Sequence, residues 1–193
     1  MSEAEQNSPA KFWDIVKADL LANAGHRKLG RTFSAFLFVP GFATIFLHRV
    51  AGPFIRTPLD KLGNLIWAWN TRRSGCHLHL DSLIAPGLCL PHPTAVVIGS
   101  GVRVGPNATV YQSVTIGKST KSEGYPVIGR DVVIYPGSII IGSINVGDRA
   151  VIGAGSIVIS DIPADAVVAG NPARILRIGT AAADAAAGGP SSR

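Results

Sequence analysis

The residue best suited to acid–base chemistry is His92, which lies in the segment Pro91-His92-Pro93-Thr94. Imidazole titrates near neutral pH, so a positioned histidine can accept a proton and return it within one reaction. A second pair, His77 and His79, alternates with Leu78 and Leu80, as in a strand with one exposed face. A His-x-His pair also suggests a metal, but no third ligand is nearby, so we expect no metal site.

Cys89 is the other reactive residue type near His92. A cysteine nucleophile needs an adjacent base and an electropositive setting, and the sequence indicates neither, so we interpret Cys89 as buried filler. Two cysteines form no disulfide framework and indicate a reducing compartment.

A six-residue period in the sequence predicts the fold that positions these candidates. Its repeat positions are Ile98, Val104, Val110, Ile116, Ile128, Ile134, Ile140, Val146, Ile152 and Val158. This period is typical of a parallel β-helix of hexapeptide repeats, in which three hexads close one triangular coil. We expect each repeat residue to point inward and residues three hexads apart to stack. We expect glycines and small residues to serve the corners, where the chain must bend without a Cβ in the way.

Two interruptions break the period. Leu90 and Ile98 are eight residues apart instead of six, so two extra residues fall at Pro91–Thr94 and must bulge outward. After Ile116 the polar stretch 118–125 forms a loop that leaves the coil before Ile128 resumes the period. Insertions of this kind commonly build the binding face of a solenoid.

The N-terminal part of the chain, 1–73, has a different texture. Apolar spacing predicts helices in 10–23, in 30–50 as one helix or two interrupted at Pro40, and in 58–72. We therefore divide the chain into a helical region, 1–73, a β-helix domain, 74–178, and a low-complexity tail, 179–193, expected to be disordered.

Charge is concentrated in the helical region. The chain carries a net +6, and residues 1–73 hold ten Lys and Arg against five Asp and Glu. This excess favours an anionic membrane face or a phosphorylated ligand, unless it is merely a basic surface. Basic runs with interleaved aromatics are lacking, so nucleic acid is not an expected partner.

A fifteen-residue apolar run, 33–47, is broken by Pro40-Gly41 and is shorter than the roughly 20 residues of a membrane span. We interpret it as helices packed on a core, with peripheral membrane contact as the alternative. The N-terminus lacks a signal-peptide pattern. We therefore expect a cytoplasmic protein, with the inner face of the membrane as the alternative site.

The hexads, the polar loop and the segments IGAGSIVISDIP and AGNPARIL resemble the left-handed β-helix acyltransferases. Within that superfamily, LPHPTAVVIG and VYQSVTIGKSTKS are similar to serine acetyltransferase and equally to polysaccharide acetyltransferases of the colanic-acid type. The resemblance is strong over 76–178 and weak over the N-terminal helices. It implies a left-handed, mainly β fold and an acetyl-CoA-dependent O-acetyltransferase. It also implies a homotrimer with active sites between adjacent prisms, and it leaves a hexamer open.

The same resemblance implies roles for residues. His92 becomes the base that takes the acceptor hydroxyl's proton and returns it to the CoA thiolate. The wall facing CoA is implied to include Gly117, Lys118, Ser119, Pro136, Ala154 and the segment 171–174, which contains Arg174. Gln112 and Tyr125 are candidate acceptor contacts. Lys118 and Lys121 either meet CoA phosphates or are solvated loop charges.

The sequence departs from serine acetyltransferase at four polar positions. Pro91 replaces an Asp that helps hold the amino acid, and His77 replaces an Asp that orients the catalytic imidazole. Gly124-Tyr125 replaces an Arg-His pair. His77 either takes over the orienting role or is a surface residue.

A site that has lost such partners discriminates less well, so we expect a sugar or polysaccharide precursor as acceptor. The alternatives are L-serine as acceptor, and a non-catalytic β-helix binding protein.

Overall fold

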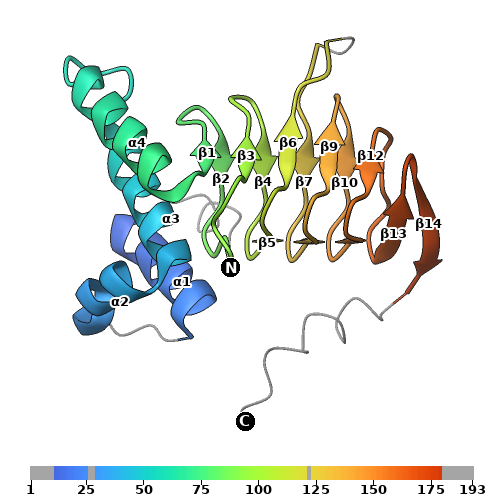
Figure 1. Ribbon diagram of the computed structural model, residues 1–193, viewed down its shortest axis with the longest axis horizontal. Coiled ribbons are helices and arrows are strands. Elements are labelled where there is room, and N and C mark those ends of the chain that lie inside the picture. Colours follow the sequence, from blue (N-terminus) through green and yellow to red (C-terminus); the bar gives the residue numbers. More distant parts are fainter. Residues whose placement is uncertain (1–10, 26–28, 121–122, 180–193) are drawn as a thin grey trace, which may run out of the picture.

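The computed structural model describes residues 11–25, 29–120 and 123–179 and places a group of helices at one end of a β-solenoid (Figure 1). The helices are α1 (Phe12–Ala24), α2 (Thr32–Phe38), α3 (Pro40–Ala51) and α4 (Asp60–Ser74). Short 3₁₀ turns occupy Leu29–Arg31 and Gly52–Phe54. All three predicted helical segments are confirmed, whereas residues 1–10 and nearly all of the predicted tail lie outside the described part of the chain.

Local chemistry sets the helix ends. α1 and α4 both stop at a glycine in the left-handed conformation, Gly25 and Gly75, each with φ of 69°. Glycine adopts this conformation without a steric penalty. Pro40 occupies the first turn of α3, where its missing N–H costs nothing, and the extended residue Val39 separates α2 from α3. The segment 30–50 is therefore two helices.

The solenoid consists of short strands that follow one another around three sheets. The first sheet contains β1 (His77–Leu78), β3 (Val97–Ile98), β6 (Thr115–Gly117), β9 (Ile139–Ile141) and β12 (Ile157–Val158). The second contains β2 (Leu83–Ile84), β4 (Arg103–Val104), β7 (Val127–Ile128) and β10 (Asn145–Val146). The third contains β5 (Thr109–Val110), β8 (Val133–Ile134), β11 (Val151–Ile152), β13 (Ala166–Gly170) and β14 (Ala173–Ile178). The fold is the left-handed parallel β-helix that the repeat and the resemblance predicted.

Strand register confirms the stacking. Ile152 pairs with Ile134, and Ile116 pairs with Ile98, so each pair spans one coil of three hexads. All ten repeat residues are at most 2% exposed. The small residues four positions after a repeat residue, such as Ala108 and Ser138, are also fully buried. The interior is thus a continuous column of β-branched and small side chains.

The register also locates the two insertions. His77 pairs with Val97 across Pro91–Thr94, and Thr115 pairs with Ile139 across the polar loop. Both pairings span more of the chain than the three hexads of a regular coil. The extra residues therefore leave the coil, and Figure 1 shows the loop after β6 projecting away from the solenoid.

The reason expected for the glycines after each repeat residue was wrong. Glycines such as Gly105 and Gly129 do not have positive φ; instead, a Cβ at Gly105 would lie 2.6 Å from the backbone of Gly129 in the next coil. The left-handed corner positions are held largely by other residues, including Asn107, Asp131 and Arg149. Close approach between coils, and not chain bending, requires glycine at these two positions, whereas a Cβ on Gly117 would meet nothing within 4 Å.

The helices expose apolar side chains. On α4, Leu62, Leu65 and Trp69 are 43%, 63% and 51% exposed, although their spacing predicts one apolar face. Phe33 and Phe38 of α2 are exposed as well. Among the described helices none is long and apolar enough to cross a membrane alone; α2 joined to Pro40–Phe54 has the length and composition, with a bend of 114° between the two parts.

The stacking generates a stability prediction. Ile152→Asp would bury a carboxylate without a partner in the column, and we expect it to lower the free energy of unfolding by about 3–5 kcal/mol. Thermal denaturation measures the effect, with Ile159→Asp as the matched control because Ile159 is 56% exposed. A normal melting temperature for Ile152→Asp would contradict the register.

His48, between α3 and the first coil, generates a second prediction. Burial lowers the pKa of His48 from 6.5 to about 4, the neighbouring Arg49 charge also acts to lower it, and a hydrogen bond with the Leu78 backbone acts in the opposite direction. At His48 the unfolded chain therefore binds a proton more readily than the folded chain does. Stability present above pH 6.5 should fall by up to roughly 3 kcal/mol as the pH drops toward 4.

Unfolding followed across that pH range checks the effect. His48→Gln should flatten the profile, whereas His92→Gln, at an exposed histidine, should keep its shape. Equal slopes for wild type and His48→Gln would show that other groups dominate.

Candidate functional site

The bulge that carries His92 is an exposed turn pinned at its base. The Thr94 N–H donates to the His92 carbonyl at 2.8 Å, which closes the turn. Ala95 donates to the Gly75 carbonyl and Ser113 to the Thr94 carbonyl, both at 3.0 Å. His92 therefore stands in solvent on a segment whose backbone is fixed to the coils on either side.

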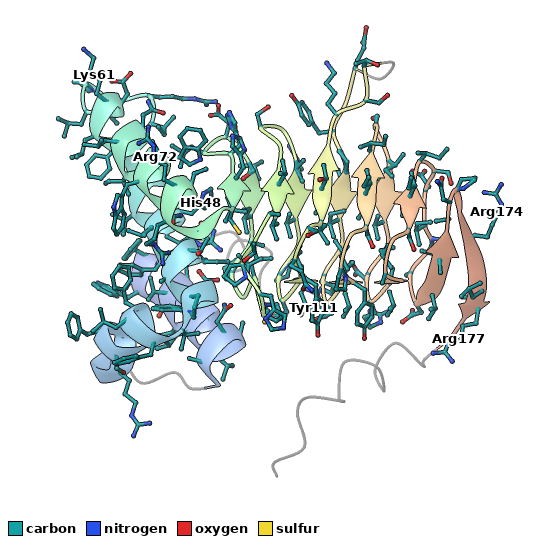
Figure 2. All side chains as sticks on the ribbon, in the orientation of Figure 1. His48, Lys61, Arg72, Tyr111, Arg174 and Arg177 are labelled. Carbon is teal, nitrogen blue, oxygen red and sulfur yellow. The ribbon has the colours of Figure 1, made fainter. Side chains whose placement is uncertain are left out.

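Two tyrosines continue from His92 along the third sheet. The His92 ring lies 6.4 Å from that of Tyr111, and Tyr111 stacks on Tyr135 at 5.3 Å with an interplanar angle of 15°. Figure 2 shows Tyr111 on the outer surface of the solenoid. The sequence analysis did not single out either tyrosine, because the register of successive coils brings them together.

A pocket of about 320 Å³ lies beside the bulge. Its lining residues are Pro40, Arg73, Ser74, Pro91, His92, Pro93 and Thr94. Two helices and the bulge thus build one concave surface, and the candidate base shares it with an arginine from α4. Larger pockets exist between the helices and the first coil, but His92 does not line them.

The helices hold the segment that leads into the bulge. Asn23 donates to the Leu88 carbonyl at 2.8 Å and accepts from the Leu90 N–H at 3.0 Å. The first turn of α3 packs so tightly here that a Cβ on Gly41 would clash with the Leu90 carbonyl. Leu90 is the residue before Pro91, so these contacts fix where the bulge begins.

A buried ion pair extends this clamp. Asp19, 1% exposed, accepts from Arg49 Nε at 2.9 Å and from the Gly87 N–H at 2.8 Å. Arg49 also donates to the carbonyls of Ile84 and Ala85. Sequence analysis missed Asp19, Asn23 and Arg49, because their partners lie far away along the chain.

His77 is not hydrogen-bonded to His92 among the described residues. Its ring packs edge-on against Trp67 at 5.1 Å and lies 6.3 Å from that of His79. Its Nδ1 is buried without a hydrogen-bond partner in the described part of the chain. The orienting role of His77 therefore stays a prediction.

The cysteines are poor nucleophiles. Burial raises the pKa of the Cys89 thiol, and a hydrogen bond with Thr109 opposes this only in part. Burial likewise raises the pKa of Cys76. Both thiols stay protonated at neutral pH. Cys76 is buried, whereas Cys89 is only half-buried, so the prediction that Cys89 is buried was wrong. In the described residues no group of three or more His, Cys, Asp or Glu is arranged to hold a metal ion.

The two candidate acceptor contacts have different surroundings. Among the described residues the Gln112 Oε1 is buried without a hydrogen-bond partner, and so it retains an accepting capacity. Tyr125 packs against Gly101 at the base of the polar loop, and its hydroxyl accepts from Ser100 at 2.8 Å. Neither residue lines the pocket beside His92.

The residues implied to face CoA lie along the solenoid and not around one pocket. Gly117 and Lys118 begin the projecting loop, where the Lys118 Nζ lies 6.0 Å above the Tyr125 ring, and Ser119 follows. Pro136 and the exposed Ala154 lie on later coils. Arg174 is exposed on β14, at the far end of the solenoid (Figure 2). Lys121 falls outside the described residues.

Comparison with known proteins gives a consistent set of relatives. No family model matches the sequence. The chain is 33% identical over 168 residues to serine acetyltransferase of Bacillus pumilus, covering 86% of this chain and 77% of the relative. It is 33% identical over 169 residues to serine acetyltransferase of Synechococcus elongatus, where the match spans 86% of this chain but only 66% of the relative's length.

Solved structures agree. The crystal structure of Neisseria gonorrhoeae serine acetyltransferase superimposes with a TM-score of 0.77 at 30% identity, covering 90% of this chain and 69% of that one. Soybean serine acetyltransferase complexed with serine gives a TM-score of 0.76 at 32% identity, covering 90% and 72%.

Proposed function

The chain belongs to the serine acetyltransferase family, whose members are acetyl-CoA-dependent O-acetyltransferases, and from this premise we propose that it acetylates a hydroxyl of a small acceptor. The observation that carries the proposal is His92, an exposed imidazole on a clamped bulge that lines a pocket. L-serine is the first candidate acceptor, because the relatives found are serine acetyltransferases. They favour serine over the saccharide that the sequence analysis put first.

Direct transfer accounts for each atom. His92 accepts the proton of the acceptor hydroxyl as the oxygen attacks the thioester carbonyl carbon. The tetrahedral intermediate then breaks its C–S bond, and the protonated imidazole returns the proton to the CoA thiolate. The products are the acetyl ester and free CoA, and no step calls for a metal.

The extended co-substrate suits the extended set of residues. Lys118 and Arg174 supply positive charge for CoA phosphates, and Gly117, Pro136 and Ala154 offer small or apolar surface along the coils between them. We propose that acetyl-CoA lies along the solenoid with its thioester near His92.

We further propose assembly as a homotrimer in the cytoplasm, where acetyl-CoA is available. Support comes from an outward-facing apolar cluster on the third sheet, continuous with His92. Its part-exposed members are Tyr111, Tyr135 and Val167, which pack against the buried side chains of Val133 and Val151. Such a stripe fits the face of a neighbouring prism, which would place the site between subunits. A hexamer and peripheral membrane contact stay predictions.

A saccharide hydroxyl is the second candidate acceptor, favoured by specific residues. Pro91 offers no side-chain hydrogen bond, and His77 stands where an orienting carboxylate is expected from the resemblance. The stacked Tyr111 and Tyr135 beside His92 present aromatic surface of the kind that sugar rings pack against.

Removing the base tests the mechanism. His92→Ala should lower kcat by roughly two to four orders of magnitude, the usual contribution of a general base. The melting temperature and its upward shift with CoA should remain, because the exposed ring supports neither the core nor the proposed CoA path. If turnover stays near that of wild type, the base lies elsewhere, and His77 is the next residue to test.

A parallel acceptor assay tests the substrate. Release of the CoA thiol at saturating acetyl-CoA should give a kcat/KM for L-serine at least tenfold above that for sugars and nucleotide sugars, or about 1.4 kcal/mol of discrimination. His92→Ala is the control, since it should silence every true acceptor. A saccharide with the tenfold advantage would establish the second candidate. No turnover and no thermal shift with CoA would leave the non-catalytic binding protein.

A further inference from the structure

We propose that Arg73 forms an anion-binding subsite that holds the negatively charged group of the acceptor, a carboxylate or a phosphate. The proposal rests on the proposed function and adds the residue that recognises the substrate's charge. Arg73 lies in the last turn of α4 and lines the same pocket as His92. A charge recognised there sits within one small cavity of the group that removes the proton.

The guanidinium is held in place from three sides. Its Nη2 donates to Thr44 Oγ1 at 3.3 Å and to Asn70 Oδ1 at 3.2 Å, and its Cζ lies 5.8 Å from the centre of the Trp69 ring. Thr44 in turn donates to the carbonyl of Pro40, which lines the pocket. The side chain is therefore ordered beside the pocket before any ligand arrives, which lowers the entropic cost of binding.

The charge of Arg73 is not neutralised within the described part of the chain. Both hydrogen-bond partners are neutral, and none of the described carboxylates lies within ion-pair distance. Two of these acids are paired elsewhere, Asp19 with Arg49 and Asp81 with Arg56. Arginine has five N–H donors and keeps its charge in proteins, so Nε and Nη1 remain for an oxyanion.

An oxyanion on the acceptor is the ligand that fits this arrangement. An oxygen of a carboxylate or a phosphate accepts a charge-assisted hydrogen bond from Nη1 or Nε, whereas the parallel two-bond contact would need Nη2, which Thr44 and Asn70 occupy. The polar loop offers no comparable group at its end, because Gly124 and Tyr125 stand where the resemblance places an Arg-His pair. The cations assigned to CoA, Lys118 and Arg174, lie on the loop after β6 and on β14, away from the helices. Arg73 is thus placed to serve the acceptor.

The experiment combines removal of the Arg73 charge with removal of the negative charge on the acceptor. Wild type, Arg73→Gln and Arg73→Lys are assayed with L-serine and with L-serinamide, which lacks the carboxylate, and with a sugar phosphate and its free sugar. Arg72→Gln is the matched control, since Arg72 is the neighbouring arginine on α4, exposed like Arg73, and does not line the pocket. Melting temperatures verify the fold, and Gln retains a donor for Thr44.

For whichever anionic acceptor turns over, Arg73→Gln should raise the KM for that acceptor at least tenfold, with kcat within about threefold and the KM for acetyl-CoA unchanged. The preference for the anionic member of the pair should shrink by the same factor, Arg73→Lys should restore part of it, and Arg72→Gln should behave as wild type. The proposal would be overturned if Arg73→Gln lowered kcat/KM for serinamide as much as for serine. It would also be overturned if only the KM for acetyl-CoA rose.

Binding separates this inference from the proposed function. If wild type acetylates none of the acceptors, the function fails, and calorimetric titration with L-serine and with inorganic phosphate still tests the subsite. Binding of either anion that weakens at least tenfold in Arg73→Gln supports it. Equal affinity in the two proteins, or no binding to wild type, overturns it.

Discussion

The stacking of β-branched residues inside the prism is the constraint on which the rest of the structure depends. Each coil places an Ile or Val over the same position of the previous coil, and the column admits neither a charge nor a change of register. Residues beyond the three hexads of a coil must therefore leave it. The strand pairings across Pro91–Thr94 and across the polar loop mark where they do so. Both segments that leave the coil are polar or proline-rich. The reactive groups lie on these segments because the regular apolar core has no place for them.

A solenoid has an open first coil, and here the helices cover it. Besides the apolar contact of Ile45 with the core, they bind backbone groups of the coil's segment 84–90 through Asp19, Asn23 and Arg49. A buried ion pair adds little net stability, but removing one partner is expensive, so such a pair fixes geometry more than it adds free energy. The same helices supply Pro40 and Arg73 to the pocket at His92. The helical region is thus part of the site as well as a cover for the coil.

Sequence alone predicted the elements whose cause is local or periodic. The hexad period indicated the register, including the pair Ile134 and Ile152, and the longer gap after Leu90 indicated the bulge. The reason inferred for the glycines was wrong, because a close approach between coils leaves no mark that separates it from a bend. The period could not reveal Arg73 or Tyr111, whose partners are set by packing between distant segments. Their residue types are ordinary, and only the fold makes them neighbours of the bulge.

The charges around His92 bear on which acceptor the site suits. None of the residues that line its pocket is acidic, while Arg73 supplies a positive charge. A serine bound there would satisfy its carboxylate, but its ammonium would need an acceptor from elsewhere, since Pro91 has no polar side-chain atom. Gln112 Oε1 is unpaired among the described residues, but it is buried and does not line this pocket, so a neighbouring prism is the remaining source of that acceptor. A phosphorylated sugar presents no such second charge. Recognition of serine therefore depends on assembly in a way that recognition of an anionic sugar does not, whereas the proton transfer at His92 is the same for both.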